Sequence, residues 1–407
     1  MDMEVMVQRA KSPLADQRIK KVEAFPVSIK YAIPVSSAYG TRHFMDGVLL
    51  KITTDGGFVG FGEAGATIPG YLGETQESIL SSIGKILGPN ALLGADPLRI
   101  GAIVHKMDSL LLGNTQAKAT VDLALHDLAG RILGVPVYKL LGGGGSERNP
   151  IAWVVTASDV KQVTEDARRA AEEGFGHIDI KVAALSPEED IKRVSSIRDA
   201  VGKDVKLTVD ANGAWTPDMA IHTLGRMKKY DLYAVEQPTS DIFGMAEVRR
   251  RTGLTIVADE SVRTLSDLRT VIETRAADVC GVKIARVGGL FKTRQLVNVA
   301  EAAGLPLEIL STVGTGLLCA AEATMLSSSN WFSRWTVGHK ASNGLMFIYG
   351  VLNTKQMDRS NDLIRGGVEI DHATVLTPAG VGLGVEVDEN ILLKNLTQGF
   401  KPVVISS

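Results

Sequence analysis

From about residue 150 onward, short apolar runs alternate with longer stretches in which apolar residues recur at helical spacing. This alternation predicts short buried strands joined by amphipathic helices. The expected strands are residues 151–156, 177–182, 205–210, 233–236, 255–259, 279–284, 306–311 and 331–337, and helices 160–173 and 190–201 are the clearest connections. Eight such units predict an α/β fold, a closed (β/α) TIM-type barrel. An open doubly wound sheet is the competing fold, but the Gly-rich first turn that it would normally show is missing.

The first 145 residues follow a different order, with strands first and helices afterwards. Strand-like runs at 22–28 and 47–52 are followed by the turn 55–57 and a further run at 58–61, which predicts a hairpin. Helical periodicity then extends from about 75 to 133 and stops at Gly134-Val135-Pro136. A glycine run at 142–145 lacks the GxGxxG spacing and is interpreted as a linker. We expect a flexible tail 1–17, an N-terminal α+β domain 18–145, a barrel 146–375, and a C-terminal segment 376–407 that returns to the N-terminal domain.

Composition narrows the class of protein. The chain has 407 residues, a net charge of −2 and 45% hydrophobic residues, which provide a sizeable core and no electrostatic case for nucleic acid or an anionic membrane. Two cysteines make no disulfide framework, so a reducing cytoplasm is the expected location. Neither a signal-type apolar region nor an 18-residue apolar run is present. We expect a small-molecule substrate and a homo-oligomer.

Charged residues stand at the ends of five successive expected strands, about one βα unit apart: Lys181, Asp210, Glu236, Asp259 and Lys283. The carboxyl ends of barrel strands meet at one rim, where the active sites of such barrels lie. A single charged residue at a strand end is usually solvated and without function. If all five were of that kind, their regular placement would require five independent coincidences. The sequence therefore predicts one cluster of three acids and two lysines.

The residue types in this cluster indicate the chemistry. Three carboxylates provide an oxygen-rich site for a hard cation, Mg²⁺ first and Mn²⁺ second. A metal of this kind binds a substrate carboxylate and stabilises the enediolate that forms when the α-proton leaves. Lysines on the second and sixth strands would lie on opposite sides of the metal, where each could take or return a proton as a general acid or base.

The chain resembles the enolase superfamily, specifically the muconate lactonizing enzyme subgroup, over roughly residues 22 to 392. The resemblance rests on six motifs: Gly113-Asn114-Thr115-Gln116-Ala117-Lys118, Leu140-Leu141-Gly142-Gly143, Val209-Asp210-Ala211-Asn212, Val235-Glu236-Gln237-Pro238, Ala258-Asp259-Glu260-Ser261 and Val282-Lys283-Ile284-Ala285-Arg286-Val287-Gly288-Gly289. It implies a capping domain whose loops close over the barrel mouth. Members of the mandelate racemase/muconate lactonizing enzyme family are racemases, epimerases, cycloisomerases, dehydratases and a synthase.

The resemblance also implies residue roles. Asp210, Glu236 and Asp259 match the Mg²⁺ ligands of the family, and Lys181 and Lys283 match its acid/base lysines, a pairing for which this superfamily is known. Around them we expect supporting residues that do not bind the metal themselves: Glu260 by resemblance, and Asn212 and Asp179 by their positions beside the ligands and the lysine.

Two positions depart from the subgroup pattern. Its second barrel strand carries Lys-x-Lys, whereas this chain has Asp179-Ile180-Lys181, with both charged residues on one face of the strand. An aspartate there should raise the pKa of Lys181, where a lysine would lower it. At the end of the seventh strand, Leu310 replaces the glutamate typical of muconate cycloisomerases, and no histidine marks the mandelate racemase branch. Both departures argue against muconate as the substrate.

Weaker candidates for substrate binding lie in loops. Residues 36–44 occupy the place of a family specificity loop, Tyr71 lies in a second one, and two polar residues follow the seventh strand; together the candidates are Tyr39, Arg42, His43, Tyr71, Ser311 and Thr312. An arginine there could pair with a distal anion of the substrate, although an exposed turn charge is the alternative. Trp331 and Trp335 are expected to pack in the barrel rather than to line a pocket.

These observations predict a Mg²⁺-dependent isomerase: a racemase, epimerase or cycloisomerase that abstracts the proton α to a carboxylate. One alternative is a lyase of the same superfamily, a dehydratase of an acid sugar or a hydroxy amino acid. The other is a barrel that binds its ligand without catalysis, which Asp179 alone favours. Specificity resides in loops and pocket walls, so the sequence leaves the substrate open.

Overall fold

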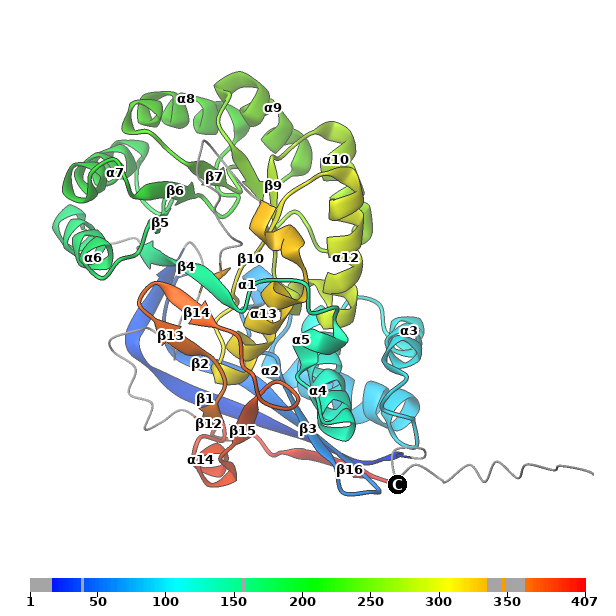
Figure 1. Cartoon of the computed structure of the whole chain (residues 1–407). Coiled ribbons are helices and arrows are strands. Elements are labelled where there is room, and N and C mark those ends of the chain that lie inside the picture. Colours follow the sequence, from blue (N-terminus) through cyan, green and yellow to red (C-terminus); the bar gives the residue numbers. More distant parts are fainter. Residues whose placement is uncertain (1–16, 38–39, 156–158, 335–345, 348–362) are drawn as a thin grey trace, which may run out of the picture.

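The computed structural model describes residues 17–37, 40–155, 159–334, 346–347 and 363–407. An antiparallel sheet in the order β16-β1-β2-β3 forms one layer of the N-terminal domain. Its strands are β1 (Ile19–Ser37), β2 (Gly40–Thr54), β3 (Val59–Glu63) and β16 (Val403–Ser406). The predicted hairpin is therefore confirmed, as β2 paired with β3. Strand β16 from the end of the chain pairs with β1, so the C-terminus lies beside the first strand (Figure 1).

Helices follow the first three strands of this sheet along the chain. They are α1 (Pro69–Leu72), α2 (Gln76–Ser81), the π-helix η1 (Ser82–Leu92), α3 (Ile100–Leu110) and α4 (Thr115–Leu133). Strand β3 lies against α4 so closely that a Cβ atom built on Gly62 would approach the carbonyl oxygen of Thr120 to 2.0 Å. Glycine at this position is therefore required for the packing of the sheet on the helix. The predicted order of strands followed by helices is confirmed.

Eight parallel strands form the barrel. They are β4 (Arg148–Val155), β5 (His177–Lys181), β6 (Lys206–Asp210), β7 (Ala234–Glu236), β8 (Ile256–Ala258), β9 (Val279–Val282), β10 (Leu307–Ile309) and β11 (Met346–Phe347). They neighbour one another in chain order, and pairing of β11 with β4 closes the ring. The sequence-based prediction of a TIM-type barrel with a capping domain is confirmed.

Helices surround the barrel on the outside (Figure 1). They are α6 (Val160–Glu172), α7 (Pro187–Val201), α8 (Pro217–Met227), η2 (Lys228–Tyr230), α9 (Ile242–Thr252), α10 (Leu265–Thr274), α11 (Ile284–Val287), α12 (Leu290–Ala303), α13 (Gly316–Ser328) and η3 (Asn330–Arg334). Helix α5 (Val137–Leu140) links the two domains. The remaining elements follow the barrel: β12 (Ile364–Gly366), β13 (Glu369–Asp371), β14 (Thr374–Leu376), β15 (Val385–Val387) and α14 (Glu389–Lys394).

The eighth strand was placed wrongly by the sequence pattern. The expected strand 331–337 begins inside a 3₁₀ helix, Asn330–Arg334, and the eighth strand is Met346–Phe347 instead. Trp331 explains the difference, because its indole Nε1 donates a hydrogen bond of 2.9 Å to the carbonyl oxygen of Leu305 and packs at the barrel wall. The packing role expected of Trp331 agrees with this contact, and Trp335 lies outside the described residues. Among the described helices, none is long and apolar enough to cross a membrane.

Candidate active site

The charged strand ends meet at the carboxyl rim of the barrel. In the parallel register, Lys181 pairs with Asp210 and Asp210 with Glu236, so three neighbouring strands bring their charged groups to one level. Asp259 directly follows β8 and Lys283 directly follows β9. The three acids and Lys283 are buried, and Lys181 is partly exposed. The clustering of these five residues is as the strand spacing predicted.

Two groups of ion pairs divide the cluster. In the first, the Nζ atom of Lys181 lies 2.7 Å from Oδ2 of Asp179 and also contacts Oδ2 of Asp210. In the second, Asp259 pairs with both Lys283 and Arg286. The first group has more carboxylates than cations, whereas the second has two cations for one carboxylate.

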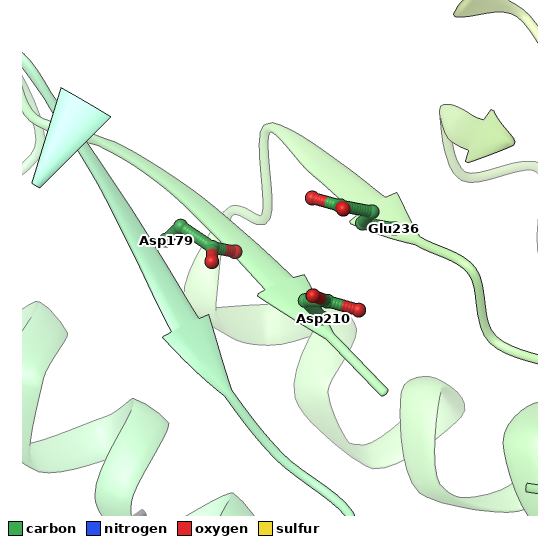
Figure 2. A group of neighbouring side chains, drawn as sticks. All are labelled: Asp179, Asp210 and Glu236. Atoms are coloured by element: carbon green, nitrogen blue, oxygen red, sulfur yellow. The ribbon is translucent and has the colours of Figure 1, made fainter. Parts of the chain in front are cut away.

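A third carboxylate, that of Glu236, converges with the two of the first group. Asp179, Asp210 and Glu236 each offer an oxygen within 4.8 Å of the others, and Figure 2 shows the side chains on neighbouring strands. Oxygen donors at such spacing form the kind of site that Mg²⁺ prefers. Asp210 and Glu236 were expected as metal ligands, and their third neighbour in this arrangement is Asp179 rather than the expected Asp259.

Asn212 and Glu260 lie beside the carboxylates. Asn212 donates hydrogen bonds from its side-chain Nδ2 to Asp210 (2.8 Å) and to Glu260 (3.0 Å), and from its backbone nitrogen to Asp210 (2.7 Å). Its φ of +46° aims both donors back at one carboxylate. These contacts fix the orientation of Asp210. The supporting role expected for Asn212 at a metal site stays a prediction.

Electrostatics hold both lysines in the ammonium form. Burial alone would lower the pKa of Lys181, but Asp179 and Asp210 outweigh it and hold the pKa well above its usual value. The pKa of Lys283 is likewise raised, because Asp259 outweighs burial. Neither lysine is therefore a ready base in this arrangement, and proton abstraction requires a further positive charge nearby.

The pKa values of the buried acids are shifted in different directions. Burial raises the pKa of Asp179 to about 6 despite the opposing charge of Lys181, and it raises the pKa of Glu236 well above its usual value. For Asp259, by contrast, Arg286 and Lys283 together outweigh burial and lower the pKa. Burial and the charge of Asp259 raise the pKa of Glu260 to about 7. The crowded acids Asp179 and Glu236 thus lack compensating positive charge.

The capping domain reaches the site through Tyr71 of α1. The centroid of its ring lies 5.4 Å from Nζ of Lys283 and 5.1 Å from the guanidinium carbon of Arg286. Both distances fit cation–π contacts. Tyr71 therefore stands at the barrel rim, as its place in a predicted specificity loop implied.

The other substrate-binding candidates are placed less closely. Arg42 and His43 lie on β2, and no contact links them to the charged cluster among the described residues; Tyr39 falls outside those residues. Ser311 and Thr312 follow β10 and hydrogen-bond with the buried carboxyl group of Glu322. Their predicted role in substrate binding stays a prediction.

Three buried charged residues were missed in the sequence. Arg286 lies on α11, three residues after Lys283, which directly precedes the helix, and both side chains reach Asp259. Glu308 lies between the apolar residues Leu307 and Ile309 on β10, and burial raises its pKa to about 8. Glu322 is the single acid in the apolar helix α13. A lone charge within an apolar element was the available signal in the last two cases.

Comparison with known proteins identifies the family. The model of the mandelate racemase/muconate lactonizing enzyme N-terminal domain matches residues 19–142, and that of the enolase C-terminal domain-like family matches residues 162–391. The chain belongs to the mandelate racemase/muconate lactonizing enzyme family of the enolase superfamily. The resemblance seen in the motifs is thereby confirmed.

Named relatives agree on the class of enzyme. An L-Ala-D/L-Glu epimerase from Bacillus subtilis is 32% identical over 90% of this chain and 96% of its own length. An N-succinyl-L-Arg/Lys racemase from Bacillus cereus is 29% identical over 92% and 97%. Chloromuconate cycloisomerases also match, for example that of Delftia acidovorans at 29% identity over 92% and 97%. These relatives confirm the prediction of an enolase-superfamily isomerase.

Solved structures show the same architecture. A mandelate racemase/muconate lactonizing family protein from Azoarcus sp. EbN1 superposes with a TM-score of 0.86 at 37% identity, over 96% of this chain and 100% of that one. A dipeptide epimerase from Cytophaga hutchinsonii, complexed with Mg and D-Ala-L-Val, has a TM-score of 0.85 at 25% identity over 96% and 100%.

Proposed function

We propose that this protein is a Mg²⁺-dependent racemase or epimerase that removes the proton α to a substrate carboxylate and returns it from the opposite face. The placement of two lysines carries the proposal. Lys181 ends β5 and Lys283 follows β9, four strands apart around an eight-stranded ring, so their side chains approach the acid cluster from opposite sides. Such an arrangement is what proton transfer at both faces of one carbon requires.

The donor set fits a divalent cation. It consists of carboxylate oxygens alone: those of Asp179, Asp210 and Glu236 converge, and buried Asp259 directly follows β8, which pairs with the strand of Glu236. Oδ1 of buried Asp179 has no hydrogen-bond partner among the described residues. We propose that Asp210, Glu236 and Asp259 hold Mg²⁺, with Mn²⁺ as a substitute. When bound, the ion supplies a positive charge that stabilises the enediolate and lowers the pKa of nearby lysines.

The chain's own residues then perform the proton transfers. One lysine accepts the α-proton as a neutral amine, and the other donates a proton to the opposite face as an ammonium group. Asn212 and Glu260 keep Asp210 oriented, and Tyr71 covers the side of Lys283 and Arg286, where it limits access of water. We place Lys181 and Lys283 as the catalytic residues.

The substrate class follows from the relatives. They are named for N-succinyl amino acids, dipeptides and chloromuconates, all of which carry a carboxylate. We propose an N-acylated amino acid or a dipeptide as the substrate. The relatives named for these compounds are racemases and epimerases, and a racemase or epimerase uses both lysines. The experiment is a panel of N-succinyl amino acids, dipeptides and chloromuconates in D₂O with Mg²⁺. Deuterium at the α-carbon together with inversion supports the proposal; turnover of chloromuconate alone refutes it.

The contact between Asp179 and Lys181 favours a second candidate. By raising the pKa of Lys181, Asp179 makes that lysine a poor base and a good resident acid. One base and one acid suit a lyase that eliminates a β-hydroxyl group. A lyase would release water from an α,β-dihydroxy acid, and the resulting enol would become a 2-keto acid, without inversion of recovered material.

A further inference from the structure

Helix α7 carries a buried ion pair outside the acid cluster. The Nη1 atom of Arg193 lies 2.9 Å from Oδ1 of Asp190, and both side chains are completely buried. Such an ion pair is costly to desolvate, and further hydrogen bonds to its polar atoms must offset that cost. Two hydrogen bonds of this pair lead to the turn that follows Lys181.

The pair holds the backbone of this turn, residues 181–183. Nη2 of Arg193 donates a hydrogen bond of 3.0 Å to the carbonyl oxygen of Lys181, and Oδ2 of Asp190 accepts one of 2.7 Å from the backbone nitrogen of Ala183. Strand β5 ends at Lys181, where pairing within the sheet stops supplying partners to the backbone. The side chains of α7 therefore continue the hydrogen bonding that the strand no longer provides.

The backbone of the turn is held in an unfavourable conformation. Ala183 has a φ of +67°, in the left-handed region that residues with a Cβ atom rarely adopt. Its hydrogen bond to Asp190 keeps it there. Backbone strain that the surrounding structure enforces is concentrated at functional sites. The turn therefore has one enforced conformation, and the side chain of Lys181 starts from a fixed Cα position.

The second lysine is positioned by different means. The carbonyl oxygen of Lys283 accepts hydrogen bonds from the backbone nitrogens of Arg286 (2.9 Å) and Val287 (3.2 Å), in the first turn of α11. Its backbone is thus fixed by the helix that it precedes. A change in the ion pair of α7 should consequently affect one lysine and not the other.

We propose that Asp190 and Arg193 are positioning residues for Lys181, which fix the backbone from which this lysine reaches the substrate. The inference rests on the proposed function, because it takes Lys181 as the base for one enantiomer. A displacement of about 1 Å between reacting groups costs about 10²-fold in rate. Loosening the turn should therefore slow the proton exchange that depends on Lys181 and spare the exchange that depends on Lys283. A merely structural role would lower both rates together.

The test measures deuterium exchange at the α-carbon in D₂O for each enantiomer separately, with Arg193→Lys. Lysine keeps a positive charge beside Asp190 but lacks the planar fork that also reaches the turn. Arg198→Lys is the matched control, because Arg198 is a buried arginine of the same helix that donates to the carbonyl oxygens of Gly202 and Val205 instead. Arg193→Lys should slow exchange of one enantiomer by about 10- to 100-fold and that of the other by less than about threefold. Arg198→Lys should leave the ratio of the two rates within about threefold of wild type.

Lys181→Ala in the same assay separates this inference from the proposed function. If Lys181→Ala slows one enantiomer while Arg193→Lys leaves the ratio of the rates unchanged, the inference is overturned and the proposed function stands. If Lys181→Ala slows neither enantiomer, both are overturned. Equal effects of Arg193→Lys and Arg198→Lys on the ratio would also overturn the inference.

A crystal structure of Arg193→Lys gives a second result that needs no substrate. We expect Ala183 to leave the left-handed region and the Cα atom of Lys181 to move by about 1 Å. Wild-type positions of both residues would overturn the inference. If Arg193→Lys does not fold, Asp190→Asn takes its place in both experiments, because asparagine keeps the volume but offers one oxygen to two donors.

Discussion

The division of labour between the two lysines is tested by replacing Lys283 with alanine or arginine. Arginine keeps a positive charge beside Asp259 but cannot accept a proton. Arg286 remains paired with Asp259 in both variants, so the acid is not left as a lone buried charge. A positioned general base contributes about 10²- to 10⁴-fold, or about 2.7–5.5 kcal/mol of activation free energy. Both variants should lose that factor for one hand of the substrate only.

The assay follows deuterium at the α-carbon by NMR in D₂O, with each enantiomer of the best substrate from the panel tested separately. Lys181 should still exchange the proton of the enantiomer that faces it, without inversion. The other enantiomer should exchange about 10²- to 10⁴-fold more slowly than with wild type. Equal and complete loss for both hands would refute the two-base reasoning, as would wild-type rates in the arginine variant.

Three further predictions concern the acids and the contact between the two domains. Glu236→Gln should abolish activity while its thermal unfolding midpoint stays near that of wild type, because rim residues serve chemistry more than stability; an active variant contradicts this role. Asp179→Lys at saturating Mg²⁺ should move the rising limb of the pH–rate profile, where the general base loses its proton, to lower pH, since Lys181 loses a carboxylate that raises its pKa; an unchanged profile means that Lys181 is not the base. Buried Glu63 accepts a hydrogen bond of 2.8 Å from the backbone of Thr315 and one from its hydroxyl group, so Glu63→Gln should lower the free energy of unfolding by about 2–4 kcal/mol in denaturant titration. The exposed Glu77→Gln is its control, with an expected change below about 0.5 kcal/mol.

Most of the fold was predictable because its signals are local. The strands that end at Lys181, Asp210 and Glu236 read as short apolar runs closed by one charge, and parallel pairing then puts those charges in register. The prediction of the eighth strand was wrong because the aromatic pattern near Trp331 resembles that of a strand. A tertiary hydrogen bond from Trp331 to Leu305 instead holds this segment in a 3₁₀ helix.

The clustering of the charged strand ends was predictable from the sequence, but the ion pairs among them were not. Alternation placed Asp179 and Lys181 on one face, and the structure brings them into contact. No sequence pattern shows which charged side chains on separate strands form ion pairs, because the pairing depends on side-chain length, conformation and burial. Hence the pairing of Asp259 with Arg286, and the approach of Asp179 to Glu236, emerged only in three dimensions.

Exchange of the α-proton with solvent, measured with and without metal, tests the central claim most directly. Wild-type protein in D₂O with Mg²⁺ should incorporate deuterium at the α-carbon of at least one N-acylated amino acid or dipeptide. Treatment with excess chelator should stop the incorporation, and added Mg²⁺ or Mn²⁺ should restore it. Incorporation that continues unchanged in chelator would contradict the account, because the acid cluster would then have no part in stabilising the deprotonated substrate.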